Sequence, residues 1–150
     1  RSMEDWGENV YILAVAFAIW GLDRHRRSRL VCIALASVFL FHGFSKVANV
    51  SGFAEMMGLP VFIAALVTFA EVAGGLGILI GGFGKELITR LAALAIIPVM
   101  LGAIVMVHAP RWSFVPTEGF PMGGMEFQGV LALIASYFLI LGNAQPGKAA

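Results

Sequence analysis

The chain has 150 residues, of which 59% are hydrophobic and 13% are charged, and its mean hydropathy is +0.89. A soluble domain carries about 25% charged residues, so this composition excludes that class and indicates a membrane protein. The net charge of +1 gives no sign of a nucleic-acid-binding surface, and the single cysteine, Cys32, excludes an internal disulfide, a CxxC redox pair and a cysteine-held iron–sulfur cluster.

The first apolar segment occupies residues 6–22, with Trp6 and Trp20 near its ends. A helix of this length rises about 25 Å, slightly less than the roughly 30 Å of hydrocarbon in a bilayer. We favour a spanning helix, with a helix lying in the interface as the alternative. Residues 24–29 hold four arginines, which predicts a cytoplasmic anchor. Residues 1–29 are therefore expected to be an N-terminal hydrophobic helix and a basic cytoplasmic loop.

Four more apolar segments predict a four-helix membrane domain over residues 30–142. Residues 51–59 are expected to be a linker, 81–85 a tight turn, and 109–125 a loop whose aromatic side chains lie on the membrane face. Residues 143–150 are expected to be a polar tail. The predicted fold is an all-α membrane protein, a four-helix transmembrane bundle plus the extra N-terminal helix. Its four spans are residues 30–49, 60–80, 86–108 and 126–141.

The second of these spans ends in small residues at helical spacing. In lipid, such residues let two helix backbones approach closely, and the pattern indicates packing. The glycines concerned are Gly74, Gly75, Gly77 and Gly81. Basic residues also predict the orientation: with residues 24–29 in the cytoplasm, Lys85 and Lys148 fall on the same side, so the C-terminus is expected to be cytoplasmic.

Five polar residues interrupt or flank the apolar spans, and they are the candidates for chemistry: His42, Lys46, Glu71, His108 and Glu126. His42 and Lys46 are four residues apart and share a helix face. Glu71 lies roughly 16 Å into its helix, where a carboxylate must be paired or protonated. We therefore expect a Lys46–Glu71 ion pair in an outward-facing pocket lined by His42.

The alternatives are that Lys46 snorkels to the interface and that His108 and Glu126 are ordinary helix-end residues. His42 and His108 could hold a haem between helices, and the two histidines with Glu71 and Glu126 could hold zinc. Neither spacing favours such a site, so no metal is expected.

At these residues the sequence resembles the DoxX family of small bacterial membrane proteins, over about residues 30–142. The shared features are the stretches 41–46 and 71–81, followed by Arg90, residues 102–103, His108 and residues 126–127. The resemblance implies a four-helix bundle in the bacterial cytoplasmic membrane. Some relatives are linked to thiosulfate oxidation with quinone as acceptor, and others accompany redox or stress-defence enzymes. The N-terminal segment and the C-terminal ending depart from the family pattern.

The first functional hypothesis is an accessory or structural subunit of a membrane redox assembly, with the lipid bilayer and a protein partner or further copies of the chain around it. The second is a quinone-reactive oxidoreductase component of the thiosulfate–quinone type, with quinone held in the polar pocket. A transporter is the third. The sequence names no substrate and leaves enzymatic activity open.

Overall fold

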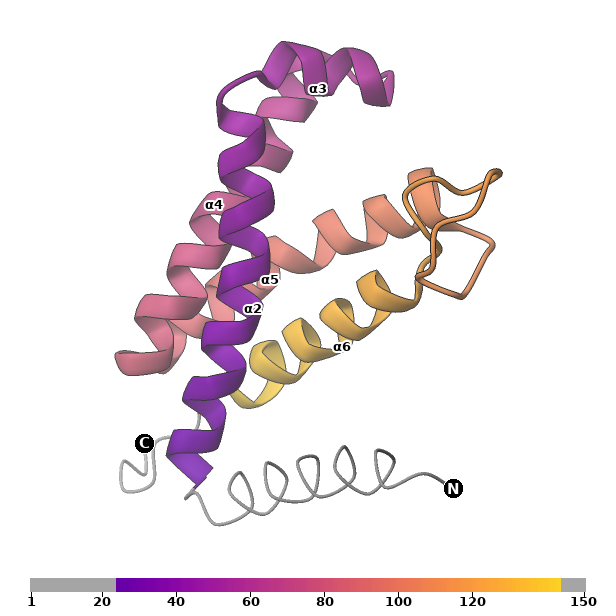
Figure 1. Ribbon diagram of the computed structural model, residues 1–150. Helices are drawn as coiled ribbons and strands as arrows, with labels where there is room; N and C mark the ends of the chain where they lie inside the picture. The colour runs from indigo at the N-terminus through magenta and orange to yellow at the C-terminus, as the bar shows by residue number, and fades with distance from the viewer. Residues whose placement is uncertain (1–23, 144–150) are drawn as a thin grey trace, which may run out of the picture.

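The computed structural model describes residues 24–143, with side chains from residue 28 onward. Within this part the regular elements are all helical, with five α-helices and one π-helical segment, and the loop over residues 109–125 holds one isolated β-bridge between Thr117 and Phe120 (Figure 1). The elements are α2 (Arg24–Val47), α3 (Val50–Met57), α4 (Val61–Phe83), α5 (Glu86–Ala103), η1 (Ile104–His108) and α6 (Glu126–Leu141). The predicted helix over residues 6–22 lies outside the described residues.

Three helical stretches among the described residues are long and apolar enough to cross a membrane: Ser28–Val47, Val61–Phe83 and Glu86–His108. The last of them joins α5 to η1. Helix α6 is apolar but has only 16 residues, a rise of about 24 Å. The chain is therefore an all-α, multi-pass membrane protein. The sequence predicted four spans over residues 30–141, and the structure has three long candidate spans and one shorter apolar helix there.

Two segments that were predicted as loops are helical. Residues 24–29 form the beginning of α2 and not a loop, because arginine is a good helix former and no glycine or proline interrupts them. The linker predicted at residues 51–59 is helix α3 for most of its length. The Asn49 side chain caps it by accepting a hydrogen bond from the Gly52 amide at 2.9 Å, and Gly58 ends it in the left-handed conformation.

Helix α4 lies between α2 and α5, and α6 packs on α5 (Figure 1). Helices α2 and α6 hardly touch, and α5 and α6 lean away from α2 and α4 towards the 109–125 loop. The bundle is therefore closed at one end and open at the other. The largest members of the buried core are Phe39, Phe138, Leu35, Ile78 and Ile96.

Glycines let α4 approach both neighbours. Gly75 faces α2, where a methyl group in place of its hydrogen would come within 2.9 Å of the Leu40 side chain. Gly77 faces α5, where the same addition would come within 2.6 Å of the Ala92 Cβ. Gly74 and Gly81 lie on this α5 face too. The glycine stripe is thus divided between two interfaces inside the chain.

Asn143 corrects the prediction of a polar tail that begins at this residue. Its side chain is buried, and its amide nitrogen donates to the Gly81 carbonyl near the end of α4. This bond ties the end of α6 to the turn between α4 and α5. Residues 144–150 lie outside the described part of the chain.

Candidate functional site

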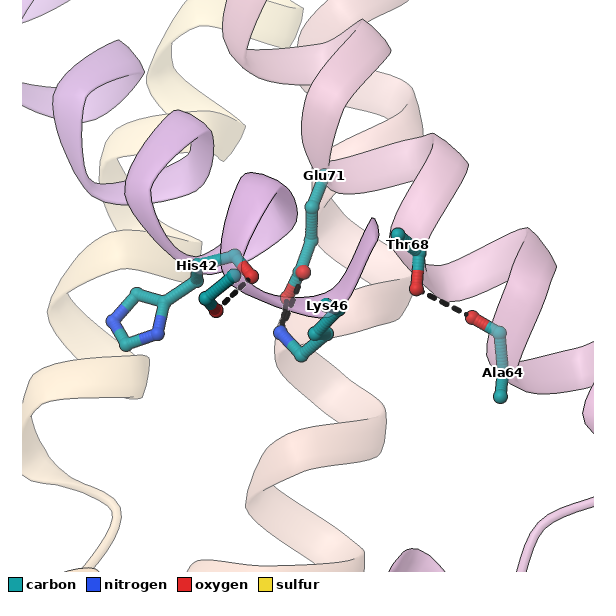
Figure 2. A network of polar contacts seen from close by, with 6 residues as sticks. His42, Lys46, Ala64, Thr68 and Glu71 are labelled. Carbon is teal, nitrogen blue, oxygen red and sulfur yellow. Dashed lines mark hydrogen bonds and ion pairs between the residues drawn. The ribbon is translucent and has the colours of Figure 1, made fainter. Parts of the chain in front are cut away.

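Lys46 and Glu71 form an ion pair between α2 and α4 (Figure 2). The Lys46 Nζ lies 2.7 Å from Glu71 Oε1 and 2.5 Å from Oε2. The glutamate is 4% exposed, and a charge at such a position in an apolar helix needs a partner, which Lys46 supplies. Gly43 makes the contact reachable, because a methyl group there would come within 2.7 Å of the Val72 side chain and force α2 away from α4.

Helix α3 covers this ion pair. The Lys46 Nζ lies 5.1 Å from the centre of the Phe53 ring, a distance at which a cation is attracted to an aromatic face. Thr68, one turn before Glu71, takes no part in the pair, because its hydroxyl donates to the Ala64 carbonyl at 2.8 Å (Figure 2). The ammonium is therefore held by one residue of α4 and one of α3.

His42 lies one turn before Lys46, and its ring points away from the Glu71 carboxylate (Figure 2). The side chain is exposed, and its ring meets that of Phe41 edge to face at 5.5 Å. It therefore does not join the ion pair, but it faces the same cavity as Lys46 and Glu71.

His108 is buried at the end of the π-helix η1. The buried positions of α5 include Ala92, Ile96 and Met100, so a continued α-helix would place Val107 next on that face. A π-helix holds one extra residue per turn and gives this place to His108. The change of helix type is thus what turns the imidazole inward.

Both ring nitrogens of His108 have partners. Nδ1 lies 3.0 Å from the Gly123 carbonyl oxygen, and Nε2 lies 2.9 Å from the side-chain nitrogen of Gln128. Gly123 has a positive φ of 75°, which suits glycine, and a side chain there would collide with the Phe114 carbonyl. The loop and α6 together fix the ring. Sequence reasoning missed Gln128, whose position two residues into α6 looked like that of an ordinary helix-end residue.

These side chains line one cavity of about 860 Å³ at the open end of the bundle. Its walls come from all five helices and η1 and are mostly apolar. Five of the chain's seven methionines line it: Met56, Met57, Met100, Met106 and Met122. Methionine is unbranched and flexible, so such walls adapt to the shape of a ligand. The polar lining comprises the pairs Lys46–Glu71 and His108–Gln128, together with His42, Ser45 and Asn49.

The family model for DoxX matches residues 30–109. This chain belongs to the DoxX family. The matched region of this DoxX protein contains four of the five predicted polar residues, whereas Glu126 and the neighbouring Gln128 lie beyond it. No curated protein and no solved structure matches the chain significantly.

Glu126 has a different place from the other four predicted residues. It does not line the cavity; its Oε2 accepts a hydrogen bond from the Phe114 amide at 3.1 Å, and it opens α6. The loop's backbone also bonds to the start of α6, with the Glu126 amide donating to the Trp112 carbonyl at 2.8 Å. Glu126 therefore orders the loop that holds His108.

In the part of this DoxX protein that the structure describes, no three His, Cys, Asp or Glu side chains are grouped so that they could hold a metal ion. What the arrangement offers is a hydrogen-bonding site in an apolar cavity, with a charged pair on one wall and a histidine–amide pair on another.

Proposed function

We propose that this DoxX protein is a quinone-binding component of a membrane redox assembly. The observation that carries the proposal is the cavity of about 860 Å³ in the membrane domain, with mostly apolar walls and a few polar side chains. Sites for small molecules have volumes of about 300–1,000 Å³ and this same balance of apolar surface and few polar groups. A quinone fits this description because it is an apolar ring with carbonyl oxygens and reaches the site through the bilayer.

Lys46 supplies a donor for a quinone carbonyl. An ammonium group has three N–H donors, and the contacts with the two Glu71 oxygens use two of them. The third is available to the Phe53 face or to a ligand in the cavity. The buried carboxylate keeps the ammonium in place, so the donor is positioned before a ligand arrives.

A purely structural role has less support. The small-residue stripe of α4 is used inside the chain, against α2 and α5, so it is not a surface for a partner helix. The family resemblance alone supports membership of a redox assembly, because some relatives accompany membrane redox enzymes.

The proposed orientation places the cavity towards the outer face of the bacterial cytoplasmic membrane. The Arg29 guanidinium lies 5.1 Å from the centre of the Phe83 ring, so the start of α2 adjoins the end of α4. Lys85 and Arg90 follow at this closed end, opposite Lys46 and α3. The positive-inside rule supports a cytoplasmic closed end, with the end of α6 on the same side.

Equilibrium dialysis of the protein in lipid nanodiscs against a short-chain ubiquinone analogue tests the proposal. Val67→Trp would fill the cavity that Val67 lines, and we expect it to weaken binding at least about tenfold. Leu133→Trp is the matched control, because Leu133 is 71% exposed on α6 and does not line the cavity. Absence of saturable binding to the wild type would reject the proposal, and so would undiminished binding to a folded Val67→Trp variant.

A further inference from the structure

The Gly123 carbonyl determines where the proton of the His108 ring lies. A carbonyl oxygen only accepts hydrogen bonds, so Nδ1, 3.0 Å away, carries the hydrogen. In a neutral imidazole Nε2 then presents a lone pair and needs a donor. The only donor that a glutamine side chain has is its amide NH₂, so the nitrogen of Gln128 must be the atom at 2.9 Å.

This orientation leaves the other end of the Gln128 amide without a partner. Its Oε1 is shielded from solvent and accepts no hydrogen bond in the described part of the chain. An unpaired buried acceptor is unfavourable, and most such groups in folded proteins are satisfied. The side chain lines the cavity, so a ligand hydroxyl bound there is a candidate partner for Oε1.

The cavity is therefore asymmetric in its hydrogen bonding. Lys46, from α2, offers donors beside the Glu71 oxygens that it already pairs with, and Gln128, from α6, offers an acceptor that no group in the described part of the chain uses. These two helices stand on separate sides of the open end and hardly touch each other (Figure 1). A ligand that satisfies both walls needs an oxygen that accepts at one end and a hydroxyl that donates at the other.

We infer that the cavity selects the reduced carrier, a hydroquinone, over the oxidised quinone, with Gln128 as the residue that sets this preference. The inference rests on the proposed function and names the redox state of its ligand. One hydroquinone oxygen accepts from the Lys46 ammonium, and the hydroxyl on the opposite side of the ring donates to Gln128 Oε1. A quinone has two carbonyl oxygens and no hydroxyl, so it leaves the Gln128 acceptor unpaired.

Anaerobic equilibrium dialysis against the wild type in nanodiscs, with a short-chain ubiquinol, the matching ubiquinone and the ubiquinol dimethyl ether, tests the inference. We expect the ubiquinol to bind about tenfold more tightly than the other two, because only it carries a donor. Equal affinities, or tighter binding of the quinone, would overturn this inference and leave the proposed function standing. Absence of binding by all three would overturn both.

Gln128→Met assigns the preference to its residue, because methionine keeps the length of the side chain and removes the acceptor. We expect its affinity for the ubiquinol to fall to that for the ubiquinone, which changes little. A folded variant that keeps the tenfold preference would show that another acceptor makes it, and the His108 Nε2 that loses its donor in this variant is the nearest one. The wild-type comparison with the dimethyl ether needs no variant, so it remains decisive if Gln128→Met does not fold.

Discussion

The Lys46–Glu71 pair has the features of a contact whose two halves depend on each other. Glu71 is 4% exposed, and the Lys46 side chain is 18% exposed. Moving both charges out of water costs free energy that their attraction offsets only while both are present. The intact pair therefore adds little to the free energy of unfolding. Losing one member lowers that free energy strongly, because the other charge stays buried without a partner.

Lys46→Met should lower the free energy of unfolding by about 3–5 kcal/mol, because it strands the buried Glu71 carboxylate. Lys46→Met combined with Glu71→Gln should recover part of the loss. Unfolding of the single and double variants in detergent, analysed as a double-mutant cycle, measures the coupling.

The Arg90–Glu86 pair is the matched control. It has the same 2.5 Å separation but side chains that are 41% and 43% exposed, so Arg90→Met with Glu86→Gln should give a coupling of at most about 1 kcal/mol. Purely additive losses at Lys46 and Glu71 would contradict the interpretation of their contact as a coupled pair.

The sequence predicted the roles of some of these residues and not of others. Lys46 and Glu71 were paired from their depth in apolar runs, since a deep charge needs a partner. His108 was placed at a helix end and left between a functional and an ordinary role, because periodicity assumes an α-helix and η1 is not one. Gln128 carries no charge and occupies the first turn of α6, so nothing in the sequence alone separates it from a solvated helix end.

At the level of elements, α4 holds the bundle together. It contacts α2 through one glycine face and α5 through another, and these contacts depend on the absence of side chains. Replacing one of these glycines with a larger residue would push the two helix backbones apart.

Gly77→Ala should destabilise the protein by about 1–3 kcal/mol, because its methyl group meets Ala92, which has no flexible side chain to move aside. Gly77→Leu should cost more. Gly102→Ala is the control: this helical glycine has open space around it, so alanine should be neutral or stabilise by up to about 1 kcal/mol. Thermal unfolding in one detergent compares the three variants, and equal stability of Gly77→Ala and Gly102→Ala would contradict the tight contact.

Helix boundaries were predictable where composition changes sharply. The sequence predicted α6 at residues 126–141, the bounds that the structure shows. It missed α3 because Gly52 and Gly58 resemble linker residues, whereas one lies in the first turn and the other is the C-cap. The turn before α5 is also shorter than predicted, since α4 continues to Phe83.

At the level of the whole molecule, the all-α membrane class followed from hydropathy, because length and apolarity decide whether a helix can span. The opening between α2 and α6 could not be predicted in this way, since nothing in the sequence says which pairs of helices pack and which diverge. The orientation rests on charge alone and can be tested directly.

We expect a cysteine at position 119 to face the outside and one at position 85 to face the cytoplasm, because the basic residues gather at the closed end. Lys85→Cys and Gly119→Cys suit the test, since both positions are exposed and Gly119 has open space around it. In a Cys32→Ala background, a membrane-impermeant maleimide applied to intact cells should label position 119 only. Position 85 should react after permeabilisation, and labelling of both positions in intact cells would contradict the topology.

The π-helix η1 makes the length of its segment as important as its residue types. Each residue removed from a helix turns everything beyond it by about 100°. Deleting one residue between positions 104 and 107 would restore ordinary helical winding and still leave the imidazole on the inner face, because the histidine would then take the place that an α-helix gives to residue 107. A relative with one residue fewer between Pro98 and the histidine would therefore present the same imidazole from an ordinary α-helix, whereas α-helical winding without that deletion would turn it about 100° away from the cavity.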